Sequence, residues 1–171
     1  MYMGAAASAA AIGLRHATAQ APTGRAVIIE ARPQPVSIDT ARTAVIVVDM
    51  QNDFGTRGGM FDRAGIDITG IQKAVAPTAS ILDAARKAGI KVVYLKMAYR
   101  ADLSDLGRPD SINRIQHLRL GVGQRTTAPD GTESRILIRD TWNTEIVPEL
   151  KPRAEDTVLY KTRFSGFYKT D

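Results

Sequence analysis

Two charged residues stand at the ends of apolar runs, where a parallel sheet would bring them together. Asp49 follows the valine- and isoleucine-rich run Thr43–Val48, and Lys161 follows the shorter run Thr157–Tyr160. Ligands of parallel α/β sheets bind beyond the carboxyl ends of the strands, so both side chains fall where chemistry is expected. Asp49 is then either a functional carboxylate or the cap of a turn. For Lys161 the alternative is a surface ion pair with Glu155 or Asp156.

Buried strands and one long helix would position these residues. The run up to Val48 has no polar alternation, which is typical of a parallel strand covered on both faces. A second strand of this kind is Lys91–Met97. Between them, Thr69-Gly70-Ile71-Gln72 has the form of a capping box that starts a helix, and Gly89 ends it. The apolar stripe of this helix consists of Ile71, Val75, Thr78, Leu82 and Ala85. Pro77 interrupts the stripe, so the helix could also start at that residue.

The remaining segments predict loops and short elements around the sheet. Glycines at 55–59 predict a loop near the candidate site. Residues 99–135 predict a long insertion beside the site, with a short helix around 111–118 and a turn at 129–131. A further short helix is expected over 143–147, closed by Pro148. In the proline-containing lead-in 22–42, the apolar piece Val27–Ile29 either adds an edge strand or lies over the surface.

Composition predicts one domain in a chain of 171 residues with 44% hydrophobic and 24% charged content. No apolar run approaches the roughly 20 residues of a membrane span. The net charge is +5, but the basic residues are scattered among acids, so a nucleic-acid partner is not expected. The chain has no cysteine and two histidines, His16 and His117, which argues against disulfides and against a metal site.

The first 21 residues are rich in alanine and contain small-x-small patterns around Ala17–Ala21. These features are those of an export signal with its cleavage region, although a positively charged start is missing. The alternative is an alanine-rich tail. The protein is therefore expected either in the cytoplasm or, after export, in the periplasm.

Several segments together resemble the isochorismatase-like cysteine hydrolases, and the resemblance covers residues 36–171. The segments are Val47–Phe54, Ala88–Ile90, Thr141–Trp142, Val147–Leu150 and Lys161–Phe167. The ureidoacrylate and biuret amidohydrolases are the branch that looks most similar. The resemblance implies a three-layer α/β/α sandwich with a parallel, doubly wound sheet, incomplete at its C-terminus. Residues 43–171 would be the N-terminal part of this hydrolase domain.

The resemblance also implies an Asp-Lys-Cys triad and no cofactor. Asp49 matches the aspartate that takes the thiol proton, and Lys161 matches the lysine that holds the charges in place. The cysteine would lie after residue 171, and the chain has none, so it is expected to be nearly inert alone. It is then either the front part of a hydrolase or a noncatalytic relative that binds a small molecule or a partner chain across an open sheet edge.

The expected substrate is a small linear amide with a ureido or carbamoyl group. Four aromatic residues and two polar ones are the predicted substrate-binding residues, namely Phe54, Trp142, Phe164, Phe167, Asn52 and Arg163. The aromatic rings would line an apolar or planar pocket, and the polar side chains would hold a carbonyl or carboxylate. An open sheet edge also predicts a homo-oligomer.

Overall fold

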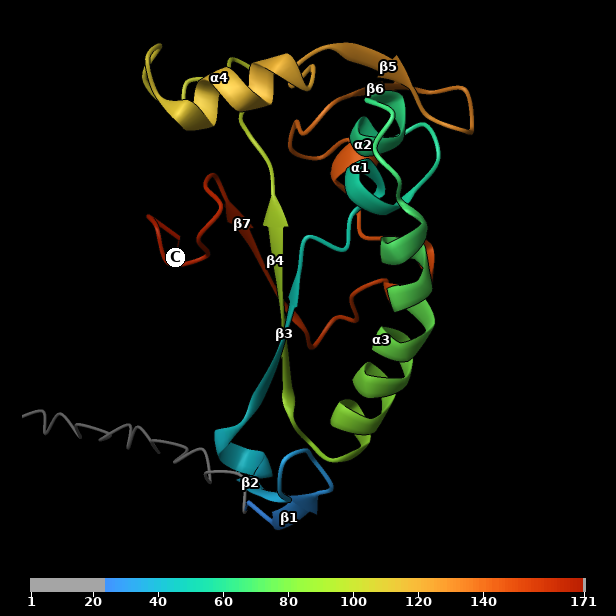
Figure 1. Ribbon diagram of the computed structural model, residues 1–171, viewed down its shortest axis with the longest axis vertical. Coiled ribbons are helices and arrows are strands. Elements are labelled where there is room, and N and C mark those ends of the chain that lie inside the picture. Colours follow the sequence, from blue (N-terminus) through green and yellow to red (C-terminus); the bar gives the residue numbers. More distant parts are fainter. Residues whose placement is uncertain (1–23, 171) are drawn as a thin grey trace, which may run out of the picture.

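A parallel sheet runs through the centre of the computed structural model, which describes residues 24–170 (Figure 1). Its strands are β3 (Ala44–Val48), β4 (Lys91–Met97) and β7 (Thr157–Lys161), in the order β3-β4-β7. The predicted strands and the α/β class with a parallel sheet are therefore confirmed. The expected export signal or tail, residues 1–21, lies outside the described residues.

One long helix, α3 (Thr69–Lys87), covers one face of the sheet. Its buried Leu82 and Ala85 share an apolar cluster with residues of β3 and β4, among them Val47, Val92 and Tyr94. The helix runs unbroken through the exposed Pro77, so a start at that residue is wrong. It ends as predicted before Gly89, whose φ of 72° suits a residue without a Cβ. No helix within residues 24–170 is long and apolar enough to cross a membrane.

The predicted capping box at Thr69 is wrong. Ile68 precedes the helix without a side-chain cap, and the Thr69 N–H donates to Asp67 Oδ1 at 2.9 Å. Gln72 turns away, and its Nε2 donates to the Gly55 carbonyl at 3.3 Å. Because Asp67 already accepts from the first turn, Gln72 is available to join α3 to the segment that follows β3.

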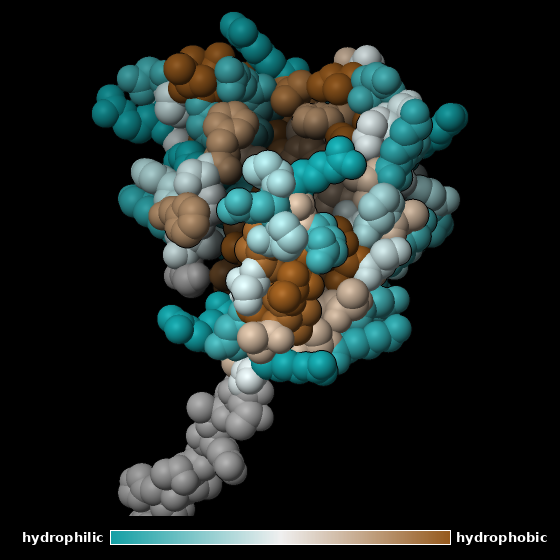
Figure 2. Space-filling view, turned by 60° about the horizontal axis from the view of Figure 1, so that its bottom comes forward, coloured by the Kyte–Doolittle hydropathy of each residue, from teal (hydrophilic) through white to brown (hydrophobic). Residues whose placement is uncertain are grey.

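The face of β3 turned away from α3 is open in the described part of the chain. Val47 is 4% exposed, whereas Ile46 and Val48 are 55% and 47% exposed. Successive side chains of a strand point to opposite faces, so β3 has one covered and one open face. The prediction that this strand is covered on both faces is wrong for the described residues, because α3 covers one side only. Hydrophobic side chains also reach the surface between hydrophilic rims in Figure 2.

An antiparallel hairpin precedes the main sheet. It consists of β1 (Ala26–Ile29) and β2 (Val36–Asp39), and the 3-10 helix η1 (Thr40–Arg42) leads from it to β3. The apolar piece at 27–29 thus forms a strand but does not join the main sheet. Figure 1 places the hairpin at the end of the molecule opposite to the carboxyl ends of the parallel strands.

The carboxyl ends of the parallel strands carry the short helices and the insertion after β4 (Figure 1). These elements are α1 (Asn52–Gly55), α2 (Met60–Arg63), α4 (Ile112–Arg119), β5 (Arg125–Thr127) and β6 (Glu133–Arg135). The predicted helix near 111–118 is confirmed, with Ser111 Oγ accepting the Arg114 N–H. The turn at 129–131 is confirmed between β5 and β6. An apolar cluster holds the insertion to the site, formed by Phe54, Met60, Met97, Tyr99, Leu106, Val122, Ile136, Leu137 and Ile138.

The helix expected over 143–147 is wrong. Two 3-10 helices, η2 (Trp142–Thr144) and η3 (Pro148–Leu150), flank an extended piece instead. In that piece the Val147 N–H donates to the Met50 carbonyl at 3.0 Å, and Ile146 forms a bridge with Gln51. Pairing with the segment after β3 thus replaces the helical hydrogen bonds.

Candidate active site

Asp49 is the first residue after β3 and turns the chain out of the sheet. Its N–H still donates to the Leu95 carbonyl at 3.0 Å, but its φ of 57° lies in the left-handed region that residues with a Cβ seldom adopt. Such strained residues cluster at functional sites, where the surroundings hold them. The turn leaves the Asp49 side chain 32% exposed at the edge of a cleft.

Lys161 is the last residue of β7, and its side chain is 1% exposed. Its Nζ lies 2.9 Å from Asp49 Oδ2 and donates to the Arg163 carbonyl at 3.3 Å. Because β4 lies between β3 and β7, the ion pair spans the end of the middle strand. The expected meeting of the two side chains at one sheet edge is therefore confirmed. Asp156, one of the two alternative partners, pairs with Arg86 instead.

The surroundings of Asp49 favour uptake of a proton. Burial raises the pKa of Asp49 above its usual value, while the hydrogen bond and the charge of Lys161 act in the opposite direction. Oδ2 is bound by Lys161, whereas Oδ1 is buried and has no hydrogen-bond partner within residues 24–170. A carboxylate with a raised pKa and a free oxygen is suited to act as a general base.

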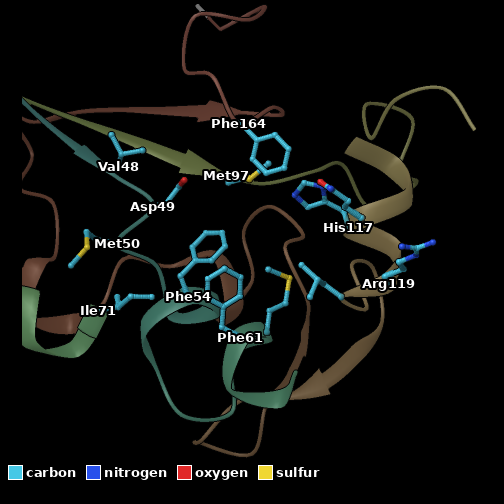
Figure 3. A pocket seen from close by; sticks show the side chains of 13 residues that line it. Val48, Asp49, Met50, Phe54, Phe61, Ile71, Met97, His117, Arg119 and Phe164 are labelled. Carbon is cyan, nitrogen blue, oxygen red and sulfur yellow. The ribbon is translucent and has the colours of Figure 1, made fainter. Parts of the chain in front are cut away.

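A cleft of about 600 Å³ opens beside the ion pair (Figure 3). Phe54 and Phe61 form one wall, with ring centroids 5.0 Å apart, and Phe164 and His117 form another, at 5.5 Å. The other lining residues besides Asp49 are Val48, Met50, Met60, Ile71, Met97, Gln116, Arg119 and Leu120. This size and this lining suit a small molecule with a planar or apolar body.

The predicted substrate-binding residues divide into two groups. Phe54 and Phe164 line the cleft. Asn52 does not line it, because its Nδ2 donates to the Trp142 carbonyl at 2.8 Å and its Oδ1 accepts from the Thr56 hydroxyl at 2.9 Å. Trp142 is likewise absent from the lining and holds Asn52 through its backbone. Asn52 thus fixes the turn after Asp49, and contact with a substrate stays a prediction.

Arg163 and Phe167 also lie outside the lining of the cleft. Arg163 Nη1 donates to the Asp105 carbonyl at 2.9 Å, which ties the end of β7 to the insertion. Phe167 is 98% exposed. Within residues 24–170, no three His, Cys, Asp or Glu side chains gather closely enough to hold a metal ion.

The sequence patterns do not single out Gln51 or Asp53, which lie fully buried beside the site. Gln51 Oε1 accepts the Met97 N–H at 2.7 Å, and its Nε2 donates to the Met97 carbonyl at 3.0 Å. Asp53 accepts the Met60 N–H at 2.8 Å, the Leu137 N–H at 2.7 Å and a hydrogen bond from Asn143. Burial raises the pKa of Asp53 to about 6 against these donors. The sequence signal that could have identified both residues is their position in the short segment that follows the end of β3.

His117 is another residue that the sequence did not predict, and it enters the cleft from α4. It lies one helical turn after Asn113, and both are buried. The cap at Ser111 shows where this helix starts, and the spacing of four then puts the two residues on one face. The sequence does not show that this face turns towards Asp49.

Known proteins are similar to this chain in sequence. Residues 43–171 match the isochorismatase domain. The chain is 39% identical over 154 residues to the ureidoacrylate amidohydrolase RutB of Rhizobium rhizogenes. This alignment covers 89% of this chain and 61% of that protein. The ureidoacrylate amidohydrolase RutB of Agrobacterium fabrum is 38% identical over 143 residues, with 84% and 61% covered. The chain thus spans 61% of the length of these relatives.

Solved structures share the fold. A cysteine hydrolase from Pseudomonas syringae pv. phaseolicola superposes with a TM-score of 0.60 at 34% identity, over 78% of this chain and 53% of that one. An isochorismatase family protein from Desulfovibrio vulgaris superposes with a TM-score of 0.54 at 34% identity. The superposition covers 75% of this chain and 56% of that one. These likenesses extend to both sequence and the arrangement of the parallel strands.

Proposed function

Because this chain belongs to the isochorismatase family, we propose that Asp49 and Lys161 form the proton-transfer half of an amide-hydrolysing site. The observation that carries the proposal is their ion pair, 2.9 Å long, beside an aromatic cleft. The substrate is a small linear ureido or carbamoyl compound, which the names of the ureidoacrylate amidohydrolases support. In this proposal, residues 43–171 are the N-terminal part of the hydrolase domain, and residues 22–42 lead into it.

The proposed chemistry gives each group one task. A thiol transfers its proton to Asp49 while its sulfur bonds to the substrate carbonyl carbon. Asp49 returns the proton to the leaving nitrogen as the C–N bond breaks, and water then releases the acyl group from sulfur. Lys161, buried beside the carboxylate, stabilises the negative charges. The chain contains no cysteine, so its residues supply the base and the cleft but not the nucleophile.

The lack of a cysteine favours a second candidate, in which the chain binds a ureido compound without hydrolysing it. The two candidates share the cleft and differ in turnover. Self-association belongs to either of them, since β3 is an edge strand of the described sheet. The molecular mass measured by light scattering in solution tests whether the chain self-associates.

Calorimetric titration of the folded 171-residue chain with N-carbamoyl-β-alanine tests the cleft. We expect binding, weakened about tenfold by Asp49→Asn, which removes a charged acceptor. Asp110→Asn is the control, because that carboxylate is 72% exposed and lies outside the cleft lining.

Turnover is tested in an extended protein that carries a cysteine-bearing segment after residue 171. There we expect Asp49→Asn to lower ammonia release by about 100-fold or more, and Lys161→Ala to do the same. Full turnover in either variant would refute the assignment of the pair. Binding without turnover in the unaltered extended protein would support the second candidate.

A further inference from the structure

His117 presents its ring to the same cleft as Asp49. The residue is 4% exposed, and its ring meets Tyr99 edge to face at 5.4 Å and lies tilted against Phe164 at 5.5 Å. Figure 3 shows the ring directed from α4 towards the cleft. Because aromatic rings contact it from two sides, its orientation is fixed before any ligand binds.

One ring nitrogen of His117 is already bonded. Nδ1 lies 2.6 Å from the Asn113 carbonyl oxygen, which only accepts hydrogen bonds, so Nδ1 carries the proton. Burial lowers the pKa of His117, and the positive charges of Lys161 and Arg163 act in the same direction against the Asn113 hydrogen bond and the charge of Asp49, which favours the neutral ring. Nε2 therefore has a free lone pair, and it makes no hydrogen bond within residues 24–170.

His117 Nε2 is thus an acceptor without a donor at the cleft, and the carboxylate of Asp49, whose side chain is 32% exposed there, is a second acceptor. An acceptor that a ligand buries without a donor costs about 1–3 kcal/mol, so the ligand has to supply N–H groups in two places. A ureido group carries N–H on both sides of its carbonyl. A carbamate of the same shape has oxygen on one side and can satisfy one acceptor only.

We propose that His117 is a specificity-determining residue whose Nε2 accepts the N–H of the substituted nitrogen of a ureido ligand. Asp49 faces the other side of the same group. The cleft consequently selects ureido compounds over O-carbamates of equal size and charge. The inference rests on the proposed function of the site formed by Asp49 and Lys161.

A matched pair of ligands tests the role of Nε2. The probes are N-carbamoyl-β-alanine and 3-(carbamoyloxy)propanoate, in which oxygen replaces the N–H. By calorimetry we expect the wild-type chain to prefer the ureido probe about tenfold, or about 1.4 kcal/mol. His117→Asn can still donate to the Asn113 carbonyl but lacks Nε2, and it is expected to lose the preference. His117→Gln places an amide oxygen near the Nε2 position and is expected to restore it.

Nitrogen-15 NMR of the ligand-free chain gives a readout that does not depend on binding. The sequence has two histidines, so the His117→Asn variant identifies the His117 signals by difference. We expect a proton on Nδ1, none on Nε2, and a shift of the Nε2 signal when the ureido probe binds. A proton on Nε2 in the free chain would overturn the inference.

The possible failures are distinguishable. If the folded wild-type chain binds neither probe, the ureido class and with it the proposed function are refuted. If it binds both probes equally, or if His117→Asn keeps the tenfold preference, the ureido class stands and the role of His117 is refuted.

Discussion

The ion pair at the sheet edge is unequally buried, and this predicts unequal costs for removing its partners. The Lys161 side chain is 1% exposed and that of Asp49 is 32% exposed. Asp49→Asn leaves a buried ammonium group without its counter-charge. Asparagine also tolerates the left-handed φ of 57°, so the backbone strain is unchanged and the variant isolates the charge. Lys161→Met instead removes the buried charge and leaves a carboxylate that water reaches.

The burial of each partner sets the magnitude. Removing one partner of a buried pair costs about 3–5 kcal/mol of unfolding free energy. We expect about 3 kcal/mol for Asp49→Asn, because Lys161 Nζ keeps its hydrogen bond to the Arg163 carbonyl at 3.3 Å. For Lys161→Met we expect less than about 1 kcal/mol, since methionine fills a similar volume and water solvates Asp49. The free energy of unfolding of the double variant is expected to be close to that of Lys161→Met.

Urea unfolding at pH 7, followed by circular dichroism, measures these differences. Asp110→Asn serves as the control for loss of an exposed carboxylate, and we expect it to change stability by less than about 0.5 kcal/mol. A cost of Lys161→Met that equals or exceeds the cost of Asp49→Asn would refute the reasoning. It would show that other contacts, and not Asp49, balance the buried ammonium.

Three further predictions concern stability. Burial raises the pKa of Asp53 from 3.8 to about 6, so the folded state binds the Asp53 proton more tightly than the unfolded state does. The resulting stabilisation is fully present below pH 3.8 and is lost as the pH rises through about 6. The loss is on the order of 3 kcal/mol and should be absent from Asp53→Asn. Gly59→Ala should cost about 3 kcal/mol or more, because its Cβ would lie 2.2 Å from the Asn52 carbonyl oxygen. Gly70→Ala, on α3 with open space around it, should instead stabilise by about 0.5–1 kcal/mol.

Denaturant titrations at a series of pH values, and thermal melts of the two alanine variants, check these expectations. Parallel pH profiles of wild type and Asp53→Asn would contradict the assignment of the raised pKa to Asp53. The comparison with Asp53→Asn is needed because other carboxyl groups also change stability with pH. The pKa of Asp156 is lowered, so its contribution to the free energy of unfolding is lost as the pH falls, opposite to that of Asp53. Equal stability of Gly59→Ala and Gly70→Ala would mean that the backbone around Asn52 can shift at little cost to make room for the added methyl group.

Local signals predicted the parts of the fold that depend on neighbours in sequence. The apolar run of β4 and the cap at Ser111 each correspond to an observed element. The wrong expectations involve partners far along the chain. Gln72 bonds Gly55 instead of closing a cap, and Val147 pairs with Met50 instead of entering a helix. In both cases a long-range hydrogen bond outweighs a local preference.

The same distinction applies to the site. Asp49 and Lys161 were predictable as a pair because both follow strands of one parallel sheet, whose ends meet at a common edge. The inward position of His117 was not predictable, because it depends on how α4 packs against Tyr99 and on where Phe164 lies after β7. The hydrogen bond from the Asn52 amide to the Trp142 carbonyl was not predictable either, because it joins residues 90 positions apart.

Gln51 acts as a substitute for a piece of backbone. After Asp49 turns the main chain away from β4, the Gln51 amide pairs with both the N–H and the carbonyl of Met97, as a peptide group of a neighbouring strand would. Its Nε2 also reaches the Thr144 carbonyl at 3.1 Å. Glutamate lacks the N–H, asparagine is one carbon shorter, and methionine lacks both polar groups. Mutational tolerance at this position should therefore be close to nil, although Gln51 is not among the residues that line the cleft.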